Sequence, residues 1–246
     1  MELKILGSSS KGNCYLLDNG KECLMIECGI PFKDVQKALN FDISRICGVL
    51  ISHEHGDHAK HVQKCLDSRI SVYASQGTLG TLNLTGNALV HPMVELQIYQ
   101  IGDFRIQPFA TQHDAAEPFG FLIYHPECGM VLFATDTYYL HYVFAGLQNI
   151  MLECNYRQDI LDSNVELGKL HPAMRTRTMK SHCGYDTCRE TLLANDLSQV
   201  NNIILIHLSE GNSNANEFKQ GIIEATGKTV HIAEKGMTIN FNKSPF

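Results

Sequence analysis

The stretch His53-Glu54-His55-Gly56-Asp57-His58 follows directly on the apolar run of residues 46–51, a pattern that predicts a polar turn at the end of a buried strand. Three imidazoles and a carboxylate packed this densely are not explained by stability, because each would need a buried partner of its own. Neutral imidazole and carboxylate suit zinc, manganese or iron, and such a turn can divide its donors between two adjacent ions. The stretch therefore predicts a metal site.

Length and composition limit the kinds of protein in which this site could occur. The 246 residues contain no long linker rich in Pro, Gly or Ser, so residues 1–246 are expected to form one domain with one sizeable core. The start lacks the pattern of a signal peptide and no apolar run approaches the roughly 20 residues of a membrane span, which predicts a cytosolic protein without membrane contact. The nine cysteines, spread along the chain without a Cys-x-x-Cys pair, are expected to be reduced. The formal net charge of −6 gives no global attraction for nucleic acid, so a polyanion would need metals and a local basic patch.

Short strands alternate with amphipathic helices along the chain. The strands are expected at residues 3–6, 14–17, 23–27, 46–51, 70–73, 104–110, 119–124, 130–134, 150–153 and 203–206, with a closing pair at 230–233 and 237–241. The helices are expected at residues 31–39 with Pro31 in the first turn, 59–66, 76–82, 186–193 with Asp186 as the N-cap, and 214–225. Two sheets with helices on both outer faces would satisfy this order.

Three further polar residues stand where apolar runs end. His113, Asp136 and His207 each follow such a run, and each one taken alone would be equally well explained as a loop residue. Two metal ions need roughly eight to ten donor positions, some of them filled by water. The candidate set supplies seven side chains, namely His53, His55, Asp57, His58, His113, Asp136 and His207.

The order, spacing and context of these residues resemble the metallo-β-lactamase superfamily, from the first expected strand to the last. A more specific resemblance is to the YycJ/WalJ-like family of single-domain hydrolases, which look like exonucleases. The strings that carry it are Gly-Ser-Ser-Ser-Lys-Gly-Asn-Cys-Tyr-Leu at 7–16, His-Asp-Ala-Ala-Glu-Pro-Phe-Gly at 113–120, Asp-Thr at 136–137, Glu-Cys-Asn-Tyr at 153–156 and His-Leu-Ser at 207–209. The resemblance implies an α/β (α+β) fold, a four-layer αββα sandwich of two mixed β-sheets flanked by helices, with a centre of two divalent metal ions.

The resemblance also implies how the ligands are divided between the two ions, which would be Zn²⁺ or Mn²⁺. The expected groups are His53, His55 and His113 for the first ion, Asp57, His58 and His207 for the second, and Asp136 as the bridge. Ions held about 3.5–4 Å apart would lower the pKa of a bridging water to give the attacking hydroxide, which Asp57 would also align. Glu27 stands where relatives usually carry an Asp, and it would orient the ligand turn without touching a metal.

His182 lies outside the seven ligands, where related phosphodiesterases place a histidine. It is the candidate for protonating a leaving alkoxide, and the alternative is a structural histidine that caps a helix. Just upstream, the run of residues 171–180 carries Arg175, Arg177 and Lys180. Such a run is commonly only a solvated face, but next to a phosphodiester site it could clamp the substrate backbone.

Three functions are compatible with this centre. The first is hydrolysis of phosphodiester bonds, as by an exonuclease-like enzyme on nucleic acid; the second is hydrolysis of a carbonyl substrate such as a lactam, lactone or thioester; the third is a metal-binding module without activity. The full ligand set disfavours the third, as it disfavours a flavodiiron-type oxygen reductase. The cations before His182 favour the first, because a neutral carbonyl substrate has no use for them. A nucleotide cofactor is not expected, because Gly12 is followed by Asn13-Cys14 rather than by the Lys-Ser/Thr of a phosphate loop.

Overall fold

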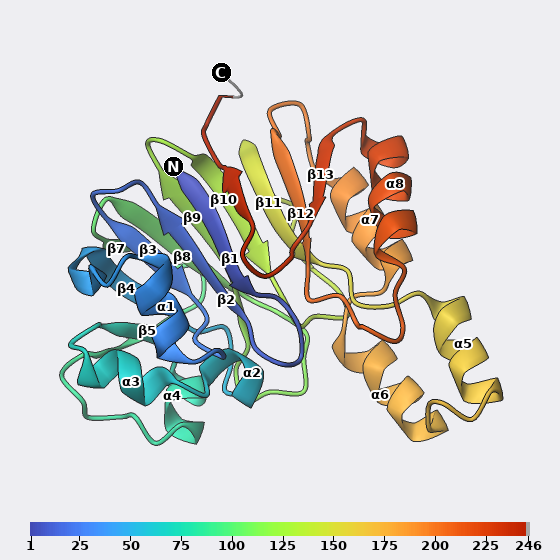
Figure 1. The fold of residues 1–246 in the computed structure, drawn as a ribbon, viewed down its shortest axis with the longest axis horizontal. Helices are drawn as coiled ribbons and strands as arrows, with labels where there is room; N and C mark the ends of the chain where they lie inside the picture. The colour runs from blue at the N-terminus through green and yellow to red at the C-terminus, as the bar shows by residue number, and fades with distance from the viewer. Residues whose placement is uncertain (245–246) are drawn as a thin grey trace.

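The computed structural model describes residues 1–244 and has two seven-stranded β-sheets at its centre (Figure 1). The first sheet has the order β14 (Thr238–Asn240), β1 (Glu2–Gly7), β2 (Cys14–Asp18), β3 (Cys23–Ile26), β4 (Ile46–Leu50), β5 (Val72–Ser75) and β6 (Val90–Met93). The second has the order β13 (Thr229–Ile232), β12 (Asn202–Ile206), β11 (Leu147–Glu153), β10 (Gly129–Ala134), β9 (Phe119–His125), β8 (Phe104–Ala110) and β7 (Tyr99–Ile101).

Both sheets are mixed, with an antiparallel half and a parallel half. Strands β14, β1, β2 and β3 pair antiparallel, and β3 to β6 pair parallel. In the second sheet β7 to β10 pair antiparallel, and β10 to β13 pair parallel. Strands in the parallel halves are covered on both faces, which is why β11 is buried along its whole length.

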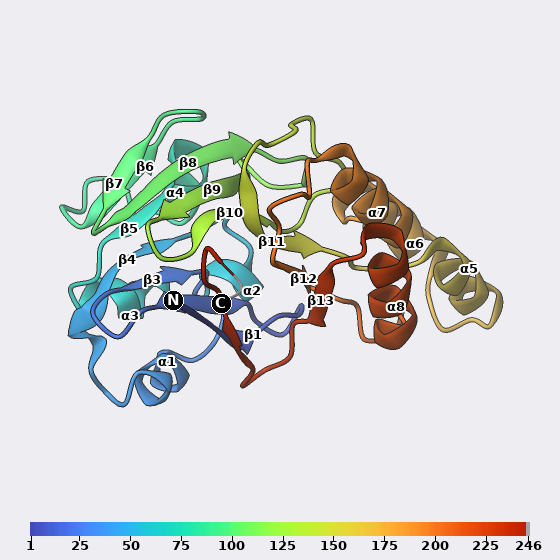
Figure 2. The same ribbon diagram turned by 90° about the horizontal axis from the view of Figure 1, so that it is seen from above.

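The helices form the two outer layers (Figures 1 and 2). The first sheet is covered by α1 (Phe32–Ala38), α2 (Gly56–Ala59), α3 (Val62–Asp67) and α4 (Gln76–Thr81), with a 3₁₀ turn at Ile43–Arg45. The second is covered by α7 (Tyr185–Ala194) and α8 (Ala215–Thr226). Side chains alternate along the strands: Ile204 faces the core between the sheets, whereas Ile203 and Leu205 pack under the outer helices. The expected four-layer αββα sandwich is confirmed.

Besides the short helix α2 and the 3₁₀ turn, four elements were not expected from the sequence. Strands β6 and β7 were missed because they are short and have no continuous apolar run. Both lie at sheet edges, where the Pro92 within β6 is tolerated. Helices α5 (Gln158–Glu166) and α6 (Pro172–Ser181) lie beyond the sheets in both views (Figures 1 and 2) and bury few apolar side chains. The expected N-cap of α7 was wrong, because the helix begins at Tyr185 with Gly184 as its N-cap.

Among residues 1–244, no helix is both long enough and apolar enough to cross a membrane.

Asp18, at the end of β2, is a buried carboxylate held by two cations. Its oxygens lie 2.7 Å from Nζ of Lys4 and 2.6 Å from Nη1 of Arg45. Burial opposes ionisation, but these partners outweigh it and lower the pKa of Asp18 below its ordinary value. The resulting stability is therefore fully present above the pKa of the unfolded carboxyl, about 3.9, and is lost as the pH falls through the lower folded pKa.

We expect Asp18→Asn to lower the free energy of unfolding by about 1–3 kcal/mol at pH 7, because Lys4 and Arg45 lose their charged partner. Denaturant unfolding of both proteins between pH 7 and pH 3 should show this difference shrinking below about pH 4. Asp42→Asn is the matched control, since Asp42 also pairs with Arg45 but is 56% exposed. An equal decrease in the free energy of unfolding in Asp42→Asn would show that the effect comes from unpairing Arg45 and not from the buried carboxylate of Asp18.

Candidate metal centre

The expected site residues meet at one edge of the sandwich because they follow strands whose carboxyl ends lie there. The turn 53–58 follows β4, whereas Asp136 follows β10 and His207 follows β12 of the other sheet. Three residues at these strand ends have left-handed backbones, with φ of 63° at Glu27, 43° at Asp136 and 54° at His207. Such conformations are uncommon outside glycine and cluster at functional sites.

The turn that carries four of the candidate ligands is fixed by backbone contacts. The amide of Asn13 donates to the carbonyl oxygen of Asp57 at 2.7 Å, and the amide of Cys28 donates to that of His58 at 2.7 Å. A Cβ atom at Gly29 would lie 1.7 Å from the carbonyl oxygen of Asp57. Only glycine therefore allows the segment after β3 to approach the turn this closely.

His53, His55, His113 and Asp136 form the first donor group. Nδ1 of His55 lies 3.1 Å from Nε2 of His53 and 3.1 Å from Nε2 of His113. Oδ2 of Asp136 lies 3.7 Å from Nε2 of His53 and 3.5 Å from Nε2 of His113. Three imidazole nitrogens and a carboxylate oxygen thus converge on one point.

Asp57, His58, His207 and the same Asp136 form the second donor group. Oδ2 of Asp57 lies 3.3 Å from Nε2 of His58 and 3.3 Å from Nε2 of His207. Asp136 reaches these imidazoles at 3.4 and 3.6 Å. All seven residues expected from the sequence are therefore brought together, and Asp136 lies in both groups.

The candidate histidine ligands fit metal ions, as the partners of their ring nitrogens that face away from the donor groups show. Nδ1 of His113 lies 2.7 Å from the carbonyl oxygen of Ser181, so it carries the proton and leaves the lone pair of Nε2 facing inward. Nδ1 of His58 likewise faces the buried Oε2 of Glu27 at 3.5 Å, and neither atom has another hydrogen-bond partner. An acceptor behind each ligating imidazole is the arrangement found around protein-bound metals.

The charges of the two groups also suit cations. Burial lowers the pKa of His53 and of His113, so both are neutral imidazoles with a lone pair to donate. Burial opposes ionisation of Asp136, but His207 and His58 outweigh it and lower its pKa well below the ordinary value. In the second group burial opposes protonation, but the carboxylate of Asp136 outweighs it and raises the pKa of His58 well above its ordinary value and that of His207 to about 10, so each ring carries a proton that a divalent ion such as Zn²⁺ or Mn²⁺ would displace.

Glu27 is completely buried behind the ligand turn, where its Oε1 accepts a hydrogen bond from the amide of Ser52 at 3.2 Å. We expect Glu27→Gln to weaken metal affinity about 10–100-fold, because Gln would no longer hold the Nδ1 proton of His58 as a carboxylate does. Competition with a chromophoric chelator measures this affinity. Glu22→Gln is the matched control, since Glu22 accepts from Nε2 of His125 at 3.0 Å away from the centre. Unchanged affinity in Glu27→Gln would contradict the orienting role.

Glu22, Asp103 and His125 form a further cluster of possible ligands, but its hydrogen bonds exclude a metal. The amide of Glu127 donates to Nδ1 of His125 at 3.1 Å, so Nδ1 has no proton. Nε2 must then carry the proton of the neutral ring, and it donates that proton to Glu22. A ring nitrogen that bears a proton cannot bind a metal.

Glu153 is a site residue that the sequence analysis quoted within a string of the family resemblance but gave no role. It is completely buried, and its Oε1 lies 2.7 Å from Nδ1 of His182 and 3.3 Å from Nδ1 of His207. Its Oε2 accepts from the amides of Thr137 and Cys183, both at 3.0 Å. The available signal was its place at the end of the apolar run 150–153, the same signal that singled out the three strand-end ligands.

His182 follows the last residue of α6 and lies beside the donor groups. Its ring stacks on that of His207 with 5.5 Å between centroids and 11° between planes. Because Glu153 holds Nδ1, the other ring nitrogen is left for a substrate. His182 and ligands from both groups line one cavity of about 350 Å³.

The basic run does not act as one unit, because its cations have different surroundings. Arg177 lines the cavity, and its Nε lies 3.0 Å from Oδ2 of Asp114. Arg175 instead joins α6 to α5 through an ion pair of 2.5 Å with Asp162. The exposed side chain of Lys180 lies outside the cavity lining.

Comparison with known proteins agrees with the fold. The β-lactamase superfamily domain family matches residues 25–208. The chain is 27% identical over 232 residues to the exodeoxyribonuclease YycJ of Bacillus anthracis, covering 87% of this chain and 84% of the relative. It is 26% identical over 224 residues to the exodeoxyribonuclease WalJ of Streptococcus pneumoniae, covering 85% and 82%. The crystal structure of the metallo-β-lactamase fold protein YhfI from Bacillus subtilis superposes with a TM-score of 0.73 at 14% identity, covering 97% of this chain and 99% of that one. As the sequence resemblance implied, the chain belongs to the β-lactamase superfamily domain family.

Proposed function

We propose that this protein is a binuclear metal-dependent phosphodiesterase that acts on nucleic acid as an exonuclease. The observation that carries the proposal is one cavity that combines the seven-donor centre with His182, held in orientation by Glu153. The relatives at 26–27% identity, which are named exodeoxyribonucleases, support it. Arg177, which is paired with Asp114, adds a cation to the lining of this cavity that a phosphate could contact and that a neutral carbonyl substrate would not need.

In this proposal the residues of the site have separate catalytic and binding roles. Two divalent ions, when bound by the two donor groups, would polarise the phosphoryl group and lower the pKa of water. Asp57, whose Oδ2 lies 3.4 Å from Nδ2 of Asn13, is positioned to align the attacking nucleophile. His182 is oriented by Glu153 to give a proton to the leaving oxygen. Arg177 lies where a neighbouring backbone phosphate would need a cation.

The test compares substrates under metal titration with Zn²⁺ and Mn²⁺. Bis-p-nitrophenyl phosphate should be hydrolysed, whereas nitrocefin and a thioester should be turned over far more slowly. End-labelled single and double strands should then shorten from one end, because an exonuclease releases terminal nucleotides. Faster turnover of nitrocefin or the thioester than of the phosphodiester would contradict the proposal and favour the carbonyl hydrolase.

Arg177→Ala should raise KM for an oligonucleotide and reduce the slope of its salt dependence by about one, since one phosphate contact is lost. KM for bis-p-nitrophenyl phosphate should stay unchanged, because that substrate has no second phosphate. Lys180→Ala is the matched control, as it removes a cation from the same helix but outside the cavity. An equal rise in KM in both variants would indicate general attraction by α6 instead of a contact by Arg177.

A further inference from the structure

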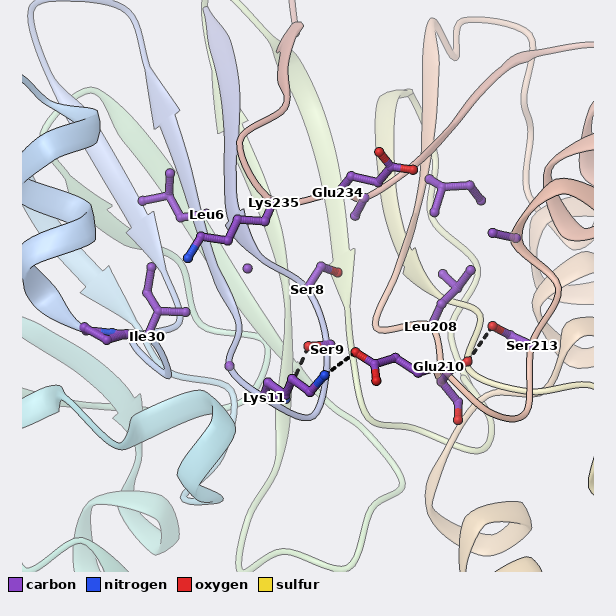
Figure 3. Close-up of a pocket in the computed structure, with 17 residues that line it drawn as sticks. Leu6, Ser8, Ser9, Lys11, Ile30, Leu208, Glu210, Ser213, Glu234 and Lys235 are labelled. Atoms are coloured by element: carbon purple, nitrogen blue, oxygen red, sulfur yellow. Dashed lines mark hydrogen bonds and ion pairs between the residues drawn. The ribbon is translucent and has the colours of Figure 1, made fainter. Parts of the chain in front are cut away.

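A second cavity, of about 680 Å³ and drawn in Figure 3, shares lining residues with the one that contains the candidate metal centre. Leu208 and Ser209 line both cavities. In the loop between β1 and β2, Ser10 lines the metal cavity while its neighbours Ser9 and Lys11 line the second one. The two cavities therefore share a boundary made of two short loops.

The second cavity is mainly apolar, and an ion pair lies on its exposed rim. Leu6, Ile30 and Leu208 contribute apolar side chains to its lining. On the rim, Nζ of Lys11 lies 2.5 Å from Oε1 of Glu210, and the two side chains are 74% and 71% exposed. Figure 3 shows these side chains pointing toward one another between the β1–β2 loop and the loop after β12. A lining that combines apolar side chains with serine hydroxyls, at this volume, suits an uncharged ring that carries hydroxyl groups.

The charges of the lining distinguish a site for rings from a channel for phosphates. The cations Lys11 and Lys235 are matched by Glu210 and Glu234, so the lining has no net charge. A channel that binds successive backbone phosphates would need unpaired cations, because the affinity comes from neutralising the phosphate charges. A base and its sugar, by contrast, gain from apolar burial and hydroxyl groups.

We propose that the second cavity binds the nucleoside that stays on the scissile phosphate after the leaving group departs. The inference rests on the proposed function. His182, the group that would protonate the leaving oxygen, follows α6 and does not line this cavity, whereas Leu208 and Ser209 connect the cavity directly to the metal centre. The leaving strand is thus assigned to the α6 side and the retained nucleoside to the side of Lys11.

Three aryl esters test this assignment: thymidine 5′-(p-nitrophenyl phosphate), thymidine 3′-(p-nitrophenyl phosphate) and bis-p-nitrophenyl phosphate. All release p-nitrophenolate, so they differ only in the group that is retained. One of the thymidine esters should have a KM roughly tenfold below that of the bis-aryl ester, because only it fills the second cavity. The preferred isomer also gives the polarity of attack.

Ala215→Phe should fill the cavity, since Ala215 lines it from the first turn of α8. The KM of the preferred thymidine ester should rise about tenfold, while that of the bis-aryl ester stays unchanged. Asn216→Phe is the matched control, because Asn216 is the next residue of the helix and is exposed. Glu210→Trp gives a second block from the exposed rim without altering the core.

Calorimetric titration of the metal-loaded protein with thymidine 5′- and 3′-monophosphate separates this inference from the proposed function. Binding that Ala215→Phe weakens and Asn216→Phe does not would support the cavity even if no ester were hydrolysed, in which case the phosphodiesterase proposal alone would fail. Equal KM values for all three esters in the wild type, or equal losses on all three in Ala215→Phe and Glu210→Trp, would overturn the assignment while phosphodiesterase activity remained.

Discussion

Asp136→Ala is expected to yield a protein without either metal ion. The Asp136 carboxylate belongs to both donor groups, and its Oδ2 lies 3.5 Å from Nε2 of His113 in the first and 3.4 Å from Nε2 of His58 in the second. It is also buried, so its removal takes the shared negative charge out of a site where water screens little. Elemental analysis after gel filtration should find two ions per chain in the wild type and close to none in the variant.

Two other variants show whether the loss is specific to a shared ligand. His55 belongs to the first group alone, so His55→Ala should retain about one ion per chain. Asp114→Ala removes an exposed carboxylate 3.4 Å from Nε2 of His113 that is in neither donor group, and it should retain both ions. Two ions retained in Asp136→Ala would exclude the bridging role.

The donor set could be predicted from the sequence because of how parallel strands end. Apolar runs such as 46–51 and 203–206 are buried on both faces, so a polar residue at their exit has no structural reason to be there. The carboxyl ends of parallel strands lie on one edge of a sheet, so residues far apart in the chain meet there. The pattern of the runs thus indicates two sheets with helices outside and candidate ligands at strand ends, whereas the four-layer sandwich and the division of the ligands between two ions came from the family resemblance.

Other features depend on contacts that the pattern does not encode. Helix α6 has one buried residue, Ser181, so it has no apolar period, and the sequence analysis treated its residues only as a basic run. The rim of the second cavity carries Lys11 and Glu210, which are 199 positions apart in loops without a motif for pairing. The left-handed backbone at Asp136 and His207 follows from tertiary packing, because neither residue type requires it.

His182→Ala is expected to slow hydrolysis of esters with poor alkoxide leaving groups by about 10²–10⁴-fold while both metal ions stay bound. His182 is in neither of the two groups that hold the seven expected ligands, although it lies with Asp136, Glu153 and His207 in an adjoining cluster. Its orientation comes from the 2.7 Å contact between Nδ1 and Oε1 of Glu153. If His182 protonates the leaving oxygen, then the decrease in hydrolysis rate must grow with the pKa of the leaving group.

The decisive measurement is therefore the rate of His182→Ala across a series of leaving groups, not on one substrate. An activated aryl ester leaves as a stable phenolate and should lose little, whereas a dinucleotide should show the full loss, so the dependence of rate on leaving-group pKa should steepen. His171→Ala is the matched control, because His171 caps the other end of α6 by accepting a hydrogen bond from the amide of Ala173. Equal losses for aryl and alkyl esters in His182→Ala would mark a histidine that only shapes the loop, since a structural defect cannot distinguish one leaving group from another.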